Sequence, residues 1–398
     1  MKVFVEEILK DLYMLRINDD RTKFFEALWN IPEGVTYNAY LLLSGNKNIL
    51  FDSWKQSYAN IFIEKLSEII NPSKLDYIVI HHMEQDHSGS IPMILDINSN
   101  VKILGHLLVK NMFRSFYGIN PNFHAVRDGE EVLIGNIKLR FIHTPFLHWP
   151  ETMMTFIPQY NILLSCDAFG GFSIPRSIYD DDEKIVSNYL KYVRKYIVTV
   201  VGRYNNFILN AIDKLKKNGI EPKIIAPAHG LVFRNNPNLI VRYYADLAKG
   251  VSKSGKILVI YSSMYGSTEK AVETAVDYLR NKGFSPIIYR FTDMIQTDIS
   301  SIISDMIDSE AVIIGTSTYE ANIFPTIRYL IDIMIEKVRV RKKVLILSSY
   351  GWGGVAATFI SRKLDKAGFQ IIDKIEFQGQ PDENVFEKIR KSIDKMVG

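Results

Sequence analysis

Residues 77–87 have the sequence Tyr-Ile-Val-Ile-His-His-Met-Glu-Gln-Asp-His. The apolar run Tyr77 to Ile80 predicts a buried strand. The segment that follows packs four metal-competent side chains into six residues: His82, Glu84, Asp86 and His87. One backbone turn at the end of a strand can aim several ligands at one point. Imidazoles mixed with carboxylates suit iron or manganese better than a thiolate site would, so this stretch predicts a metal centre.

Later segments add candidate ligands at or near the ends of predicted strands. Ile162 to Cys166 leads into Asp167, Ile224 to Ala228 leads into His229, and the segment from Thr144 to Pro150 contributes His148. A carboxylate or imidazole buried at such a point is costly without a partner, and a metal supplies one. The seven candidate ligands, four in the first segment and three in the later ones, suit two ions rather than one. Two such ions would be held about 3.5–4 Å apart by a bridging carboxylate. Asp167 is the natural bridge, because it comes from a strand of its own.

Other polar residues compete for these roles. His143 is an alternative to His148, but the following Trp149-Pro150 favours His148. His81 is out of register with the motif and is expected to be structural or to support a ligand. His106 and His124 belong to no motif, so we expect surface or core positions for them. Cys166 is the only cysteine, which excludes an internal disulfide and a cysteine-based cluster, and it is expected to be a buried structural thiol.

The motif resembles the metallo-β-lactamase fold, with one departure. Hydrolases of that fold usually carry His-x-His-x-Asp-His, and here Glu84 stands in place of the second His. Two residues, Phe146 and Leu147, separate Pro145 from His148 where those hydrolases usually have one. Both departures are typical of the flavodiiron proteins, which this chain resembles over essentially its whole length. An anionic oxygen donor in place of a neutral imidazole also favours iron over zinc.

The resemblance implies an N-terminal metallo-β-lactamase-like αββα sandwich and two non-haem Fe. In it, His82, Glu84 and His148 would serve one iron, and Asp86, His87 and His229 the other, with Asp167 as the bridge. Tyr196 falls where the family carries a tyrosine beside the irons. It could donate a proton or a hydrogen bond to a bound intermediate, and a plain core tyrosine is an equal alternative.

The pattern of the sequence changes near residue 250. The stretch from Ala248 to Gly255 is small and polar and predicts a linker, which gives domains at 1–250 and 251–398. Helices are expected at Glu183 to Val198 and Asn205 to Asn218 before it. After it, short apolar strands alternate with helices, which predicts a doubly wound parallel sheet.

Hydroxyl-rich and glycine-rich loops follow three strands of this second domain. Such loops lie at the carboxyl ends of parallel strands, where ligands bind, and free N–H groups at a helix start suit a phosphate. Gly-x-x-x-x-Gly-Lys-Ser/Thr and Gly-x-Gly-x-x-Gly are both absent. Helix capping is the alternative for Gly266 to Thr268, and packing against the neighbouring domain is the alternative for Trp352. Together the loops resemble flavodoxin, with FMN as the ligand. The implied FMN-binding residues are Ser263, Met264, Tyr265, Gly266, Ser267, Thr268, Thr316, Ser317, Thr318, Tyr319, Asn322, Ser349, Tyr350, Gly351, Trp352, Gly353 and Gly354.

Composition excludes several function classes. The chain has 398 residues, 47% hydrophobic and 23% charged, with a formal net charge of +4. The sequence has no run of basic residues with interleaved aromatics, so nothing in it favours nucleic-acid binding. Its densest basic patch, residues 339–343, is expected to form a solvated turn. No stretch has the apolar core of a signal peptide or the length of a membrane span. With its one cysteine, the chain is expected to be soluble and cytoplasmic.

The resemblance also implies an activity. FMN can take two electrons and two ferrous ions hold two more, which together reduce O2 to two waters; the same irons could turn two NO into N2O. One or both activities are implied, in a head-to-tail homodimer or dimer of dimers. No Cys-x-x-Cys is present, so electrons would come from a separate donor such as rubredoxin, a reductase or a reduced deazaflavin. The rival interpretations are a dizinc hydrolase with an accessory flavodoxin-like domain and an electron-transfer flavoprotein with a structural metal.

Overall fold

A computed structural model describes residues 1–398, which form two compact units. The N-terminal unit comprises Met1–Tyr196 and Asn206–Ala245, and the C-terminal unit comprises Ile197–Asn205 and Asp246–Gly398. The sequence did not anticipate that Ile197–Asn205 groups with the second unit, and a division at residue 250 stays a prediction. None of the helices combines the length and the apolar character that crossing a membrane requires.

The N-terminal unit contains two large sheets and a small hairpin. The larger sheet has the order β1-β2-β5-β6-β7-β8-β9, and the smaller one the order β10-β11-β12-β13-β14. The strands of the larger sheet are β1 (Lys2–Leu9), β2 (Leu12–Asp19), β5 (Val35–Ser44), β6 (Lys47–Phe51), β7 (Tyr77–Ile80), β8 (Lys102–Gly105) and β9 (Phe123–Ala125). Those of the smaller sheet are β10 (Glu131–Ile134), β11 (Ile137–His143), β12 (Met153–Ile157), β13 (Ile162–Cys166) and β14 (Ile224–Pro227). The hairpin pairs β3 (Phe24–Phe25) with β4 (Trp29–Asn30).

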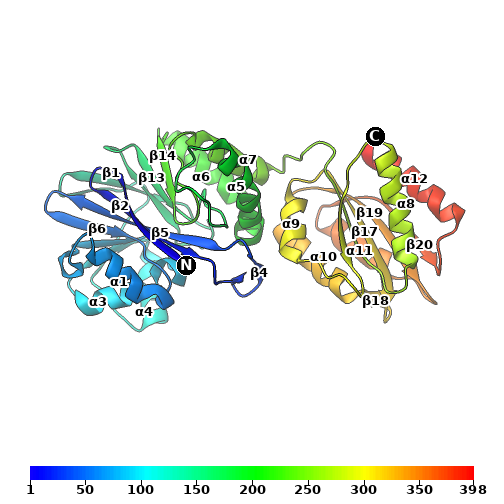
Figure 1. The fold of residues 1–398 in the computed structure, drawn as a ribbon, viewed down its shortest axis with the longest axis horizontal. Coiled ribbons are helices and arrows are strands. Elements are labelled where there is room, and N and C mark those ends of the chain that lie inside the picture. Colours follow the sequence, from blue (N-terminus) through cyan, green and yellow to red (C-terminus); the bar gives the residue numbers. More distant parts are fainter. The chain divides into compact units, whose positions relative to one another are not determined.

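The core of this unit lies between its two sheets. Leu42 and Val79 of the larger sheet and Phe141 and Leu164 of the smaller one belong to one buried apolar cluster. Burying such side chains stabilises the fold by roughly 1.5–3 kcal/mol each. Helices cover the outer faces (Figure 1), so the unit is the αββα sandwich that the sequence predicted. The helices over the larger sheet are α1 (Ala59–Ser67), α3 (Ile91–Ile97) and α4 (Leu107–Tyr117), and those over the smaller sheet are α5 (Glu183–Tyr196), α6 (Asn205–Lys217) and α7 (Pro237–Lys249).

Parallel pairing brings the ends of several strands to one edge of the sandwich. β7 pairs in parallel with β6 and β8, and β13 pairs in parallel with β14. The carboxyl ends of β7, β13 and β14 lead into His81, Asp167 and Ala228, respectively. A short helix, α2 (Gln85–Ser88), follows β7. The segments that the sequence singled out therefore meet at the edge where these strands end.

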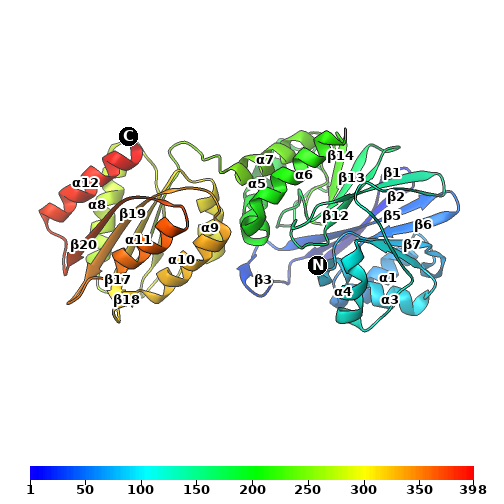
Figure 2. The ribbon, with the colours of Figure 1, turned by 180° about the vertical axis from the view of Figure 1, so that it is seen from behind.

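The C-terminal unit is built on a parallel sheet with the order β16-β15-β17-β19-β20. This order is the doubly wound one, and the chain reverses its winding direction at β15. The strands are β15 (Ile257–Ser262), β16 (Ile287–Phe291), β17 (Ala311–Tyr319), β19 (Lys343–Tyr350) and β20 (Gln370–Gln378), with β18 (Asn322–Ile323) antiparallel to β17. The helices are α8 (Ser267–Asn281), α9 (Ile299–Ile307), α10 (Pro325–Lys337), α11 (Ala356–Lys366) and α12 (Glu383–Val397). Figure 2 shows this sheet with helices on both of its faces, as predicted.

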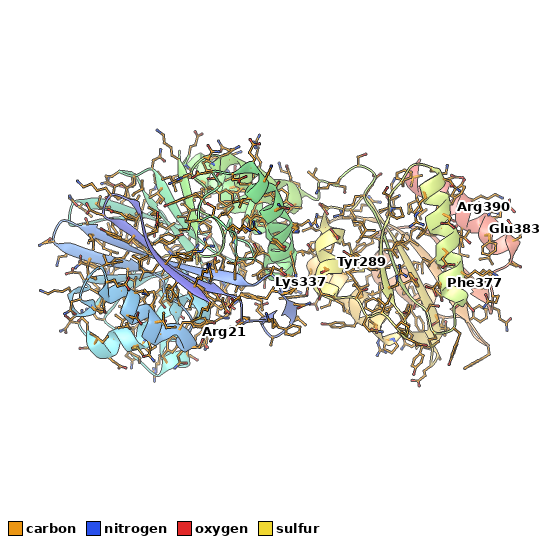
Figure 3. All side chains as sticks on the ribbon, viewed as in Figure 1. Arg21, Tyr289, Lys337, Phe377, Glu383 and Arg390 are labelled. Carbon is orange, nitrogen blue, oxygen red and sulfur yellow. The ribbon has the colours of Figure 1, made fainter.

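Apolar side chains of α8 and α12 pack on one face of this sheet. Phe377 of β20 is buried in that core, while Glu383 and Arg390 form an ion pair along α12 (Figure 3). Helix α9 was not predicted, because its serines interrupt the apolar pattern. Its start is nevertheless marked, since the Asp298 side chain accepts hydrogen bonds from the backbone N–H groups of Ser300 and Ser301.

Two predicted boundaries shift in the structure. Helix α7 continues through Ala248 and Lys249, so the irregular connection begins later than the predicted linker. Helix α5 ends at Tyr196, and the π-helical turn Ile197–Val201 follows it. Neither shift moves a predicted metal ligand.

Candidate metal centre and flavin cavity

The residues predicted to bind metal converge on Asp167. Its Oδ1 lies 3.1 Å from Nε2 of His87 and 3.1 Å from Nε2 of His229. Its Oδ2 lies 3.6 Å from Nε2 of His82 and 3.7 Å from Nε2 of His148. Each carboxylate oxygen therefore faces a different pair of imidazoles. This is the arrangement that a carboxylate bridging two metal ions requires.

Two further carboxylates complete the two halves of the cluster. Glu84 Oε2 lies 2.9 Å from Nε2 of His148 and 3.3 Å from Nε2 of His82. Asp86 lies with Oδ1 3.4 Å from Nε2 of His87 and Oδ2 3.7 Å from Nε2 of His229. We call His82, Glu84 and His148 the first half-site, and Asp86, His87 and His229 the second half-site.

Local backbone structure sets the positions of three of these ligands. Glu84 occupies the cap position before α2, and its carbonyl accepts hydrogen bonds from the N–H groups of His87 and Ser88, both at 3.0 Å. This turn places Glu84, Asp86 and His87 on one short segment. Gly89 ends the helix where a side chain cannot fit, because an added Cβ would lie 2.4 Å from the backbone of Gln56 and 2.4 Å from that of Gln85.

The cluster leaves polar atoms buried without hydrogen-bond partners. They are both carboxylate oxygens of Asp86, Oδ2 of Asp167, and Nε2 of His87 and His229. Each buried atom of this kind costs about 1–3 kcal/mol when it is left unpaired. Cations placed between the two half-sites would satisfy all of them. The residues present therefore fit a pair of metal ions, and their nitrogen and oxygen donors suit iron.

The charges in the cluster depend on one another. Burial acts against the ionised form of Asp167, but His87 and His229 hold the pKa of that carboxyl well below its usual range. Burial likewise opposes a charge on His87, but Asp86 and Asp167 raise the pKa of its imidazole to about 9. Protons on His82 and His87 thus balance part of the carboxylate charge in this protein when no metal is bound. Metal binding has to displace those protons.

Further residues support the ligands, and sequence patterns did not reveal them. Glu151 Oε1 accepts a hydrogen bond from Nδ1 of His82 at 2.8 Å, and the carbonyl of Thr36 accepts one from Nδ1 of His229 at 2.7 Å. Such contacts fix the orientation of metal-binding imidazoles. Glu151 follows no predicted strand, so the pattern used for the ligands does not indicate it. Its position two residues beyond Trp149, close to His148, was the only feature of the sequence that could have indicated it.

The remaining histidines lie outside the cluster. Both ring nitrogens of His81 are engaged, at 2.7 Å by Asp52 Oδ2 and at 2.8 Å by Thr155 Oγ1, so its role is structural. His143 lies with Nε2 3.1 Å from the carbonyl of Val126 and does not join the ligands. His106 and His124 also lie apart from them.

Two residues close to the metal cluster were predicted to have other roles. The single thiol, Cys166, is buried as expected. Tyr196 is buried, with its ring centroid 5.8 Å from that of His229, and burial together with Asp167 raises the pKa of its hydroxyl well above the usual value. A tyrosine so placed keeps its proton at neutral pH and can donate a hydrogen bond.

A cavity of about 350 Å³ opens beside the ligands. The hairpin residues Phe25 and Glu26 line it together with Lys55 and the ligands Glu84 and Asp86. Glu26 also lies close enough to Glu84 and His148 for the three to share an ion. No sequence pattern indicated Glu26, because strands as short as β3 and β4 leave no periodicity.

A second cavity, of about 440 Å³, lies at the carboxyl ends of β15, β17 and β19. The predicted FMN-binding residues on its wall are Ser263, Met264, Tyr265, Ser267, Thr268, Ser317, Thr318, Tyr319, Ser349, Tyr350, Gly351 and Trp352. Glu320 and Gly379 line it as well and were not predicted. Gly266, Thr316, Asn322, Gly353 and Gly354 were predicted but do not line it. Thr316, for example, is fully buried, with its Oγ1 3.3 Å from Oγ of Ser262.

The features of this second cavity fit a flavin phosphate and ring. Helix α8 begins after Gly266, whose φ of 85° is left-handed and which provides no side chain to cap the helix. The first N–H groups of α8 are therefore available to an anion. Ser317 Oγ is buried without a hydrogen-bond partner. Tyr265 and Trp352 are 91% and 96% exposed, so their rings offer open aromatic surface at the cavity.

Comparison with known proteins agrees with both sites. Residues 35–230 match the domain family described as "ODP family beta lactamase", and residues 259–392 match Flavodoxin. A nitric oxide reductase from Moorella thermoacetica is 31% identical over 92% of this chain and 90% of its own length. A rubredoxin-oxygen oxidoreductase from Megalodesulfovibrio gigas is 28% identical over 92% of this chain and 90% of its own. A solved mutant form of the flavo di-iron protein from Thermotoga maritima has a TM-score of 0.95 and 41% identity, covering 100% of this chain and 99% of that one.

These similarities define a two-domain class in which a metallo-β-lactamase-like unit is joined to a flavodoxin unit. The chain belongs to the flavodiiron protein family. Its cofactors are accordingly FMN, for the flavodoxin unit, and a pair of non-haem Fe, for the metal cluster.

Proposed function

We propose that this protein is an oxidoreductase that reduces O2 to water, NO to N2O, or both, and so removes these gases from the cell. The observation that carries the proposal is the position of the Asp167 carboxylate. Its Oδ1 and Oδ2 face different pairs of imidazole nitrogens at distances of 3.1–3.7 Å. Glu84 supports iron redox chemistry over zinc hydrolysis, because an anionic oxygen donor favours the harder ion. Relatives named nitric oxide reductase and rubredoxin-oxygen oxidoreductase support the two substrates.

When bound, FMN and the iron pair supply four electrons between them, which is the number that reduction of O2 to two waters requires. The protein's own residues hold that pair. The first half-site would hold one iron, the second half-site the other, and Asp167 both. Burial of His82, His229 and Asp167 keeps water from competing for the ligand positions.

Residues around the ligands would handle the substrate and its protons. Tyr196 would donate a hydrogen bond or a proton from its hydroxyl at the side of the second half-site. The cavity that Glu26 and Lys55 line would admit a small gas molecule to the ligands, with the exposed carboxylate of Glu26 and the half-buried ammonium of Lys55 at its wall.

We propose further that electrons reach the flavin from a separate donor such as rubredoxin, a reductase or a reduced deazaflavin. The sequence has a single cysteine and therefore no rubredoxin-type iron site of its own. Residues 1–250 would form the di-iron domain and 251–398 the FMN domain, in a head-to-tail homodimer or dimer of dimers in the cytoplasm. Gel filtration with light scattering would test the oligomeric state.

A paired electrode experiment tests the function. The iron- and FMN-loaded protein is reduced anaerobically, and O2 and NO consumption are recorded separately. At least one gas should be consumed much faster than by free FMN. Asp167→Asn is the matched variant, because it keeps the shape of the side chain but lacks the charge that joins two irons. Its rate should fall by at least about 100-fold, the upper end of what even outer partners of metal ligands contribute.

A further inference from the structure

One imidazole in each half-site donates its Nδ1 proton to an acceptor outside the cluster, and the two acceptors differ in kind. His82 Nδ1 lies 2.8 Å from Oε1 of Glu151, while His229 Nδ1 lies 2.7 Å from the carbonyl oxygen of Thr36. In both rings Nε2 faces the ligand cluster, so Nδ1 carries the proton and donates it. A carboxylate accepts that hydrogen bond from His82 in the first half-site, and a neutral carbonyl accepts it from His229 in the second.

Glu151 is held so that its charge acts on His82. Glu151 and His82 are both 0% exposed. Oε1 of Glu151 also accepts a hydrogen bond from the backbone N–H of Met83 at 3.0 Å, which fixes the carboxylate. Its Oε2 is buried and has no hydrogen-bond partner. No lysine or arginine pairs with Glu151, and the His82 ring is its ion-pair partner.

We infer that Glu151 makes the two iron positions electronically unequal, by stabilising the ferric ion in the first half-site relative to the second. This inference rests on the proposed di-iron function. A carboxylate that accepts the Nδ1 proton raises the basicity of Nε2, and a more basic ligand favours the higher charge on the metal. When one electron is removed from the reduced pair, the first half-site is therefore where the ferric ion forms. The Nδ1 proton stays between His82 and Glu151 throughout, so no proton leaves with that electron.

The test is a redox titration of the FMN- and iron-loaded protein, followed by the EPR signal of the half-oxidised pair. Glu151→Gln keeps the shape and an acceptor oxygen but removes the charge. It should raise the potential at which the first electron leaves. A tenfold loss of ferric preference, the lower end of the range for outer partners of metal ligands, corresponds to about 59 mV for one electron.

Asp52→Asn is the matched control, because it removes the carboxylate from another buried carboxylate–imidazole pair. Asp52 Oδ2 lies 2.7 Å from Nδ1 of His81, whose other nitrogen is taken by Thr155. This control should leave the potential within a few millivolts of the parent value, since His81 is not a ligand. Glu151→Asp, which restores the charge with a shorter side chain, should move the potential back toward the parent value.

The outcomes separate this inference from the proposed function. Unchanged potential and EPR signal in Glu151→Gln, with both irons bound, would overturn the inference even if the parent enzyme reduces O2 or NO. If Glu151→Gln does not retain iron, Glu151→Asp decides, and a potential raised in that variant by the full amount expected for loss of the charge, although the charge is still present, overturns the inference too. A parent protein that binds only one metal ion, or only zinc, would instead refute the function on which the inference rests.

Discussion

Glu84 Oε2 lies 2.9 Å from Nε2 of His148, although 64 positions separate the two residues in the chain. The contact joins the turn after β7 to the loop before β12. It puts an anionic oxygen at the position where hydrolases of this fold usually carry the second His of their motif. The identity of residue 84 should therefore decide which metal the first half-site prefers.

Replacing Glu84 with His restores the hydrolase pattern. Glu84→His should shift the metal content of purified protein from iron toward zinc, because a neutral nitrogen donor favours the softer ion. Gas reduction should fall with the iron content. Elemental analysis after growth with both metals measures this, with Glu84→Asp as the control that keeps an oxygen donor. Equal iron content in Glu84→His and the parent would contradict the role given to Glu84.

Removal of the Tyr196 hydroxyl tests its part in the reaction. Tyr196→Phe should lower the steady-state rate by about tenfold at most, because a single hydrogen bond contributes roughly 0.5–1.5 kcal/mol. Iron and FMN content should not change. Since burial and Asp167 keep the pKa of Tyr196 far above neutrality, the rate of the parent should show no titration of this group between about pH 6 and 9. A variant as fast as the parent would leave Tyr196 as a core residue only.

The flavin cavity makes a separate prediction about Trp352. This side chain is 96% exposed, so Trp352→Ala should not change the stability of the C-terminal unit. It should weaken FMN binding by about 2- to 12-fold, the equivalent of the 0.5–1.5 kcal/mol that an aromatic contact contributes. Quenching of flavin fluorescence measures the dissociation constant. Tyr329→Ala is the control, an exposed aromatic on α10 that does not line the cavity. Equal affinity in both variants would exclude Trp352 from the site.

Lys342 predicts a pH dependence of stability in the C-terminal unit. Its Nζ is buried and donates a hydrogen bond to the carbonyl of Ser309 at 2.6 Å, and burial lowers the pKa of the ammonium from 10.5 to about 8. Between these two values the unfolded chain binds more protons than the folded one. The free energy of unfolding should therefore rise with pH across that window, by about 3 kcal/mol at most, and not depend on this group below it.

Denaturant titrations at several pH values measure the effect of Lys342. In Lys342→Met the rise should disappear, whereas Lys343→Met, at the neighbouring and more exposed position, should retain it. A parent protein whose stability falls steadily from pH 8 to about 10 would show that another group dominates.

The position of the metal site could be predicted because its ligands obey a simple rule of strand topology. Asp167 follows β13 directly and His229 lies just beyond β14, and parallel strands that share an edge bring such residues together. The turn from Glu84 to His87 is short, so its donors could not lie far apart. The following Trp149-Pro150 then favoured His148 over His143, and in the structure Nε2 of His143 lies against a backbone carbonyl instead.

The supporting residues could not be predicted in the same way. Glu151 lies in the loop before β12, and its contact with His82 spans 69 positions. Glu26 lies in the turn between β3 and β4, where Glu26 and Ala27 have left-handed φ values of 50° and 58°. No periodic pattern in the sequence predicts such a turn. In the flavin cavity, Thr316 does not line the wall, because the strand β17 continues through it to Tyr319 and its hydroxyl is buried. Contacts made by loops depend on tertiary packing, not on local periodicity.

The most direct test of the account is the balance of gas and electrons on the fully reduced, iron- and FMN-loaded protein. A limiting amount of O2 or NO is added anaerobically, and the electrons consumed and the products are counted. We expect four electrons to be consumed for each O2 with no hydrogen peroxide, or one N2O to form for every two NO, and this chemistry to be lost in Asp167→Asn. Stoichiometric hydrogen peroxide from O2 with no N2O from NO, at rates unchanged in Asp167→Asn, would contradict it.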